Sequence, residues 1–368
     1  MANKQIQEAG NNSQQLQSNN MIVNFGIDEK RAREIYQEMH MQLKKDYTQE
    51  ALEIAESRVA EFENRLVSKM EAVDGALEAF ADPSFQLLIV EAQKAAASSE
   101  RPADYDLLSE LLIHRFEKGD NRLIRAGISR AVEIVDQISD EALLGLTVFH
   151  SVSCFFPASG VIQEGLNTLN DLFGKLFYCS LPVGSEWLDH LDILDSIRIT
   201  NFGSLKKIEQ YYPYMLSGYI DNGIEKNSDV YDKAVELLSN YGLPQNILKD
   251  HELNNDFVRI IVTNKDHIKF MSLELPIVDN GKLSFLKIPL TDAQISIINS
   301  IYDMYSKDVN MRDRNVKAFI EEWDKQPNLK KLREWWDNIN VNIKLTSVGK
   351  VLAHSNAQRC DKNLPPLN

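Results

Sequence analysis

Apolar residues recur every three or four positions along most of the chain, which is the spacing of an amphipathic helix. The pattern begins after Asp28, a residue suited to an N-cap, and continues to about Met70 with one break near Asp46. Residues 76–156 continue it in four shorter segments, three of which open with an N-cap or an N1 proline. The sequence therefore predicts a mainly α protein, with an antiparallel helical pile over residues 76–156.

Residues 160–255 also show helical spacing, but it is less regular. Helices are predicted over 185–199 and over 230–241, the second of which ends at Gly242. We interpret the tyrosine cluster at 211–219 as a loop packed on the helical body, because tyrosine rings anchor loops to apolar surfaces.

The last third of the chain mixes strands with helices. Residues 258–262 and 268–273 have the composition of strands, and Asp279-Asn280-Gly281 is a strong hairpin signal. A capping box at Thr291 opens a helix. Two more helices, the strand VNIKL and a final helix opening at LTSVG follow, an order typical of a winged-helix-like module. The predicted divisions are a ribbon or tail over 1–26, a long helical segment over 27–75, a helical body over 76–255 and an α+β module over 256–368.

The first 26 residues are rich in Asn and Gln and have a short apolar edge. Met21, Val23 and Phe25 alternate along one face, and Leu16 precedes the polar turn before them. Identical strands stacked in register would form amide ladders, with the apolar edge as a dry seam. The composition fits equally well a tail followed by a strand that pairs with the body of the same chain. Self-association through these four residues is therefore one of two interpretations.

A second candidate for self-association is the helix beyond Thr48. Leu52, Val59, Phe62 and Leu66 follow the three-four spacing of a coiled-coil seam. The seam is short for a free dimer, so packing of this helix against its own domain is an equal alternative.

The composition is that of a globular chain with an acidic balance. Of 368 residues, 43% are hydrophobic and 26% are charged, and the net charge is −14. This charge disfavours a large nucleic-acid footprint, which needs clustered Lys and Arg. Three widely spaced cysteines indicate neither a disulfide framework nor a structural zinc site, and they favour a reducing cytoplasm.

Residues 142–163 approach the length of a membrane span and contain no acidic or basic residue except His150. Pro157 and Gly160 interrupt the stretch, and no basic flank follows it. A buried core helix ending near Phe156 is the favoured interpretation, so we expect no membrane segment.

Local motifs for catalysis are missing from the sequence. His150 and Cys154, one helical turn apart, would face the same side, but their apolar surroundings favour a buried histidine beside a small core cysteine over a metal site. Asp189, His190 and Asp192 are interpreted as a solvated helix face. We therefore predict no catalytic residue, no metal and no cofactor. An enzyme whose site assembles from dispersed residues stays open.

Two groups of residues are candidates for contact with partners. Trp335 and Trp336 are adjacent on a predicted helix, so one ring points outward or toward another element while the other packs in the core. Lys344, Lys350 and Arg359 are candidate DNA contacts of the winged-helix-like module. The acids interleaved with them allow nucleic-acid binding without favouring it.

Two segments resemble known bacterial proteins. The run NNSQQLQSNNMIVNFGIDEKRAREI resembles an N-terminal segment of uncharacterised bacterial cytosolic proteins, and LTSVGKVLAHSNAQR resembles the end of helical bacterial proteins of the abortive-infection kind. The resemblance implies a role in phage defence or stress, and it assigns no site residue.

The sequence supports one main functional hypothesis and one alternative. The first is a non-enzymatic cytoplasmic scaffold or sensor that forms homo-oligomers and recognises an unknown protein partner. The alternative is a DNA-binding regulator that acts through the C-terminal module.

Overall fold

The computed structural model describes residues 27–367 except 44–47, 120, 201–202 and 280–281. Most of these residues are helical, so the predicted mainly α class is confirmed. The helices are α1 (Glu29–Leu43), α2 (Gln49–Glu71), α3 (Pro83–Ser98), α4 (Pro102–Glu117), α5 (Arg122–Ile134), α6 (Asp140–Cys154), α7 (Ile162–Leu176), α8 (Glu186–Ile193), α9 (Ile208–Met215), α10 (Ser217–Ile220), α11 (Asp229–Asn240), α12 (Asp292–Asp303), α13 (Val309–Asp324), α14 (Pro327–Trp336) and α15 (Ser347–Cys360). The strands are β1 (Ile197–Thr200), β2 (Ile224–Glu225), β3 (Leu248–His251), β4 (Asn254–Ile260), β5 (Ser272–Asp279), β6 (Lys282–Pro289) and β7 (Asn342–Leu345).

Side-chain caps set several helix starts where the sequence predicted them. The Asp82 carboxylate accepts a 2.8 Å hydrogen bond from the backbone N–H of Phe85, and Pro83 follows at the first helical position. Ser139 caps α6 through the N–H of Ala142, and Thr291 opens α12 with a reciprocal capping box.

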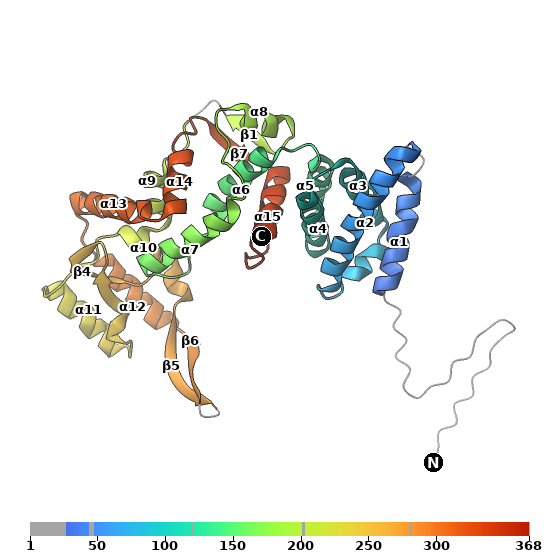
Figure 1. Cartoon of the computed structure of the whole chain (residues 1–368). Coiled ribbons are helices and arrows are strands. Elements are labelled where there is room, and N and C mark those ends of the chain that lie inside the picture. Colours follow the sequence, from blue (N-terminus) through green and yellow to red (C-terminus); the bar gives the residue numbers. More distant parts are fainter. Residues whose placement is uncertain (1–26, 44–47, 120, 201–202, 280–281, 368) are drawn as a thin grey trace, which may run out of the picture.

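The large core joins the N-terminal helices to the end of the chain. Helix α15 lies in the middle of this body and packs against α4, α5, α6 and α7 (Figure 1). Nine of its positions, Val348, Gly349 and Val351–Ala357, are buried. A methyl group at Gly349 would lie 1.9 Å from the Ser196 carbonyl oxygen, so only glycine permits this approach.

The winged-helix-like order does not form a module of its own. Strand β7 pairs antiparallel with β1, from Ile197 opposite Leu345 to Thr200 opposite Asn342. The helix after it, α15, is the centre of the body and is not an exposed recognition helix. The run 351–357 of α15 explains the difference, because it carries no Asp, Glu, Lys or Arg and is buried, with its polar side chains hydrogen-bonded inside the body.

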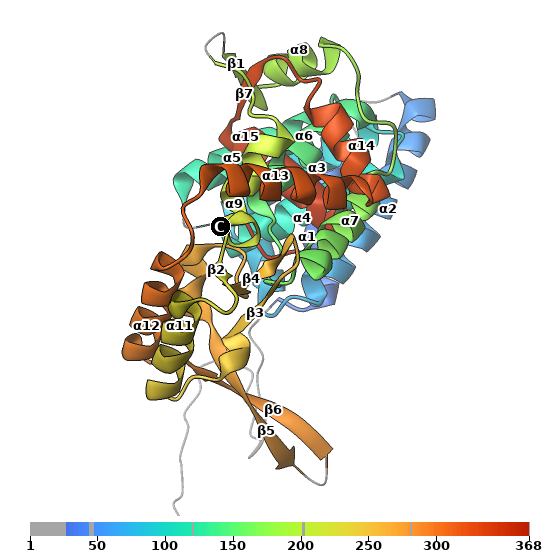
Figure 2. The same ribbon diagram turned by 90° about the vertical axis from the view of Figure 1, so that its left-hand side faces the viewer.

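A second core forms within residues 221–308, which we call the inserted unit. It contains the antiparallel sheet β2-β4-β3, covered by α11 and α12, and the hairpin β5–β6, which projects away from the body (Figure 2). Residues 309–367 then return to the large core. The two cores thus divide the chain at about 221 and 308, whereas the sequence placed one boundary after 255.

Three local expectations change. The helix expected over 185–199 ends at Ile193, because Asp195 has a φ of 58° and the chain then enters β1. The tyrosine segment 211–219 is helical, and Tyr212 and Tyr219 are fully buried. The strand expected over 268–273 begins later, at Ser272, because residues 265–270 form a 3-10 helix before β5.

The apolar stretch around α6 is a core helix, as expected. Every residue from Ala142 to Val152 is buried. Within the described residues, no helix combines the length and apolar character that crossing a membrane requires.

Candidate functional site

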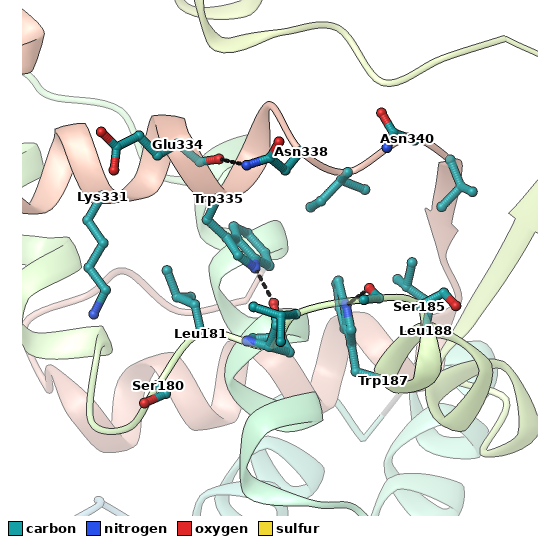
Figure 3. Close-up of a pocket in the computed structure, with 15 residues that line it drawn as sticks. Ser180, Leu181, Ser185, Trp187, Leu188, Lys331, Glu334, Trp335, Asn338 and Asn340 are labelled. Atoms are coloured by element: carbon teal, nitrogen blue, oxygen red, sulfur yellow. Dashed lines mark hydrogen bonds between the residues drawn. The ribbon is translucent and has the colours of Figure 1, made fainter.

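A pocket of about 740 Å³ opens between the segment 180–185 and the end of α14 (Figure 3). Its other lining residues are Trp187, Leu188, Lys331, Glu334, Trp335 and Asn338–Val341. The volume lies in the range of small-molecule sites. We call this the tryptophan pocket.

Two indole rings form its centre. Trp335 extends from α14 toward the segment 180–185, and Trp187 rises from the other side (Figure 3). Their ring centroids are 5.7 Å apart at an interplanar angle of 38°. The Trp335 N–H donates to the Pro182 carbonyl at 2.8 Å, and the Trp187 N–H donates to the Gly184 carbonyl at 3.1 Å. Both indole donors are therefore satisfied within the chain, and the rings offer apolar surface to a ligand.

Helix α6 supports the pocket from behind. A methyl group at Gly145 would lie 2.8 Å from both the Pro182 ring and the Trp187 ring. Such a contact is too short, so a side chain at this position would displace the two rings. The absence of a side chain at Gly145 lets both rings pack directly on α6. The pocket wall is thereby rigidly tied to the centre of the body.

The polar groups lie at the rim. Lys331 and Glu334 are exposed, and the Lys331 ammonium stands 4.7 Å from the centre of the Phe177 ring. Asn338 donates to the Glu334 carbonyl at 2.7 Å. The pocket thus combines an aromatic floor with a charged edge, an arrangement that binds apolar or aromatic groups and orients them by polar contacts.

The structure separates the two adjacent tryptophans, as the helical spacing predicts. Trp335 lines the pocket, whereas Trp336 is buried and stacks on Phe149 at a centroid distance of 5.0 Å. The Trp336 N–H donates to the Lys206 carbonyl at 2.9 Å. Trp335 therefore stays a candidate for partner contact, and Trp336 belongs to the core.

The predicted self-association residues fall into two groups. Leu16, Met21, Val23 and Phe25 lie outside the described residues. In α2, Leu52 is partly exposed, whereas Val59, Phe62 and Leu66 are buried, and α2 packs on α3 and α4. The seam is therefore occupied within its own chain, which is the alternative that the sequence left open.

The three basic candidates differ in exposure and in their contacts. Lys344 on β7 and Lys350 on α15 are exposed. Arg359 donates to Asn356 at 2.8 Å and lies 5.1 Å from the centre of the Tyr178 ring. The Arg359 guanidinium is thus held inside the body's own contacts.

The face of α8 that carries Asp189, His190 and Asp192 is solvated, since Asp189 is exposed and the other two are partly exposed. Asp195 pairs with Arg198 at 2.8 Å, and the His190 ring nitrogen accepts the N–H of Ser139 at 3.3 Å. Within the described ranges, no three His, Cys, Asp or Glu side chains are placed to hold a metal ion.

His150 and Cys154 differ in burial. His150 is 2% exposed, as expected, but Cys154 is exposed at the end of α6. His354, from α15, lies against His150, a neighbour that no spacing along the sequence indicates.

Sequence reasoning missed most of the pocket. Trp187 lies in the helix predicted over 185–199, where nothing in the local sequence indicates a site, and the segment 180–185 has no periodic pattern. Pro182 and Gly184, beside a tryptophan, were the available signal for a fixed loop against an aromatic ring.

A family model matches residues 26–365, which is most of the chain. The chain belongs to this uncharacterised family. No curated protein and no solved structure matches the sequence. The match supports neither the phage-defence resemblance nor an activity.

Proposed function

We propose that the protein is a non-enzymatic sensor or scaffold that recognises an apolar or aromatic group of a partner in the tryptophan pocket. The observation that carries this proposal is the pair Trp187 and Trp335, whose ring faces line the cavity while both indole N–H groups bond to the chain itself. Trp187 is 6% exposed and Trp335 is partly exposed, so Trp335 presents more of its ring to a ligand and Trp187 backs it. Tryptophans in such pockets are typical anchors of recognition.

The pocket favours binding over catalysis. Its titratable groups, Lys331 and Glu334, are exposed at the rim and face bulk water. A general acid or base works best in a partly desolvated position, which neither side chain has. An anion carried on an aromatic group fits this rim, because Lys331 places an exposed ammonium beside the two tryptophans that line the pocket.

Titration with 8-anilinonaphthalene-1-sulfonate, an aromatic anion, tests the pocket. Trp335→Ala removes the partly exposed ring and should weaken binding about tenfold, since burying a large apolar side chain contributes about 1.5–3 kcal/mol. Gly145→Ala should also weaken binding by displacing the Trp187 ring. Leu87→Ala, which removes a side chain that is 70% exposed on α3, is the matched control and should change nothing. Equal affinity for wild type and Trp335→Ala would rule out the tryptophan pocket as the binding site.

Self-association belongs to the same proposal and has a separate test. With the α2 seam occupied, residues 1–26 are the remaining candidate for joining copies. We expect a discrete oligomer for the full chain and a monomer for a chain that starts at Ile27, measured as solution mass by light scattering. A full chain that is monomeric at micromolar concentration would leave a sensor without self-assembly.

A cytoplasmic setting and a role in phage defence or stress are part of the proposal as its biological context. The free state of Cys154, Cys179 and Cys360 supports a reducing compartment. The defence role rests on the two resembling segments alone. If deletion of the gene does not change the survival of the host under phage challenge, the defence role is wrong.

A further inference from the structure

A thiol and two imidazoles form a hydrogen-bonded line between α6 and α15, away from the tryptophan pocket. The Cys154 sulfur lies 3.5 Å from His150 Nδ1, and the two residues are one turn apart on α6. His150 Nε2 lies 3.1 Å from Nδ1 of His354 on α15. His354 Nε2 lies 3.0 Å from the carbonyl oxygen of Pro365.

The last contact fixes every proton in the line. A carbonyl oxygen only accepts, so His354 Nε2 carries a hydrogen and its Nδ1 accepts when the ring is neutral. His150 Nε2 therefore carries a hydrogen as well, and the lone pair of His150 Nδ1 faces the thiol. Burial lowers the pKa of both imidazoles far below the usual range, which keeps them neutral. The Cys154 S–H is thus the donor to His150.

The sulfur lies at the exposed end of this line. His150 and His354 are 2% and 3% exposed, whereas Cys154 is exposed. Cys154 lines a groove of about 1280 Å³ between the body and the inserted unit. Apolar side chains, including Phe156, Leu243 and Phe270, form much of this groove, and Lys249 adds an amine. A ligand with an apolar chain has room beside the sulfur.

The resting thiol is not ionised. Partial burial raises the pKa of the Cys154 thiol. Helix α6 also ends at Cys154, where the negative end of the helix dipole disfavours a thiolate. A nucleophile in this setting needs a base that takes its proton during the attack, and the His150 lone pair is placed to do so.

We propose that Cys154 is a nucleophilic cysteine that accepts an acyl group from an activated ester or thioester bound in the groove. The Cys154 sulfur forms a bond to the acyl carbon, and the bond from that carbon to the leaving oxygen or sulfur breaks. The thiol proton crosses His150 Nδ1 to the leaving group in the same step, so no free imidazolium accumulates, and the hydrogen bond from His150 Nε2 to His354 Nδ1 stabilises the positive charge that develops on the ring. His354 is a positioning residue, because its Nδ1 holds the His150 ring with Nδ1 toward the sulfur. The product is an S-acyl cysteine, formed once per chain, which goes beyond the sensor role of the tryptophan pocket.

The chain supplies its own controls for a test. Full-length protein is treated with p-nitrophenyl octanoate, nitrophenolate release is followed, and the acylated cysteine is located by peptide mass spectrometry. Cys179 and Cys360 are both partly exposed, and the described residues place no imidazole on either sulfur. We expect Cys154 to react at least about tenfold faster than both, since a general base contributes about 100-fold or more. Reaction at Cys154 no faster than at Cys179 would overturn the proposal.

Variants then separate the base from the fold. Cys154→Ser should abolish the fast phase, and His150→Gln should slow it about 100-fold. If His150→Gln does not fold, as judged by circular dichroism, His354→Gln tests the same line and should slow the reaction less. Independent of any variant, the wild-type rate should fall in deuterium oxide, because the proton moves during the attack. A rate without a solvent isotope effect would show a preformed thiolate and contradict the assigned role of His150.

Discussion

Arg259 and Glu252 form an ion pair within the inserted unit, and their further hydrogen bonds attach that unit to the body. The Arg259 side chain is 0% exposed, and its Nη2 lies 2.7 Å from a carboxylate oxygen of Glu252. Arg259 Nη2 also donates to the Gly160 carbonyl at 2.6 Å, and Nη1 donates to the Gly218 carbonyl at 3.0 Å; both carbonyls belong to the body. The other Glu252 oxygen accepts the N–H of Ile162 at the start of α7, at 2.9 Å. Replacing either partner should therefore loosen the attachment of the inserted unit.

The contacts set the size of the expected effects. Arg259→Met fills the space but leaves the Gly160 and Gly218 carbonyls without their donor, at about 1–3 kcal/mol for each unsatisfied group. We expect a loss of about 3 kcal/mol in the free energy of unfolding. Glu252→Gln leaves a buried guanidinium uncompensated, which typically destabilises by about 3–5 kcal/mol. The Glu252 side chain is 32% exposed and glutamine keeps an acceptor, so about 2 kcal/mol is expected. The double variant should lose about 1–2 kcal/mol less than the sum, because the two residues share one interaction.

Two optical probes distinguish the cores. All four tryptophans lie in the body or pack against its core, and residues 221–308 contain none. Urea unfolding followed by tryptophan fluorescence thus reports the body, and far-ultraviolet circular dichroism reports both units. In Arg259→Met the circular dichroism transition should begin at lower urea than the fluorescence transition. Coincident transitions with an unchanged midpoint would show that Arg259 does not hold the inserted unit to the body. Additive effects in the double variant would show that Arg259 and Glu252 do not act through a shared interaction.

Local signals were sufficient for most helices, and non-local contacts decided the rest. Asp82-Pro83, Ser139 and the capping box at Thr291 fixed helix starts, because a cap depends on neighbours within four residues. The start of α15 carries an equally clear local signal, the Thr346 cap, yet its place in the centre of the body follows from partners far along the chain. The run 351–357, which has no Asp, Glu, Lys or Arg, was the sign that this helix is not an exposed recognition helix.

The candidate sites show the same limit. One of the two adjacent tryptophans had to leave the core, and the structure selects Trp335 because Trp336 stacks on Phe149. The pairing of Trp335 with Trp187 joins segments almost 150 positions apart along the sequence. His354 against His150 is likewise a contact between helices far apart in sequence. No spacing rule reaches such pairs, since they depend on the packing of whole helices.

Three further predictions address single features. Lowering the pH from 8 to 5 should reduce the free energy of unfolding, measured by urea midpoints, by about 2 kcal/mol for each of His150 and His354. Burial lowers the folded-state pKa of His150 to about 3 and that of His354 to about 4, below the unfolded value of 6.5. At pH 5 both imidazoles are therefore protonated in the unfolded chain and neutral in the folded chain, which favours unfolding. Gly349→Ala should lower the melting temperature through a loss of about 2 kcal/mol, because its methyl group meets the Ser196 carbonyl. Asp82→Ala should lose about 1 kcal/mol in the same assay, since α3 loses its cap. An unchanged stability in any of the three would contradict the contact concerned.

The claim that the tryptophan pocket binds apolar partners is tested most directly by fluorine NMR of full-length protein labelled with 5-fluorotryptophan. The four resonances are assigned by Trp→Phe substitution, and an aromatic anion such as 8-anilinonaphthalene-1-sulfonate is titrated in. We expect the Trp187 and Trp335 resonances to shift together and saturably, while the resonance of Trp323, which is fully buried, does not move. Binding that leaves Trp187 and Trp335 unshifted would show that the ligand occupies another site and that the tryptophan pocket does not bind it.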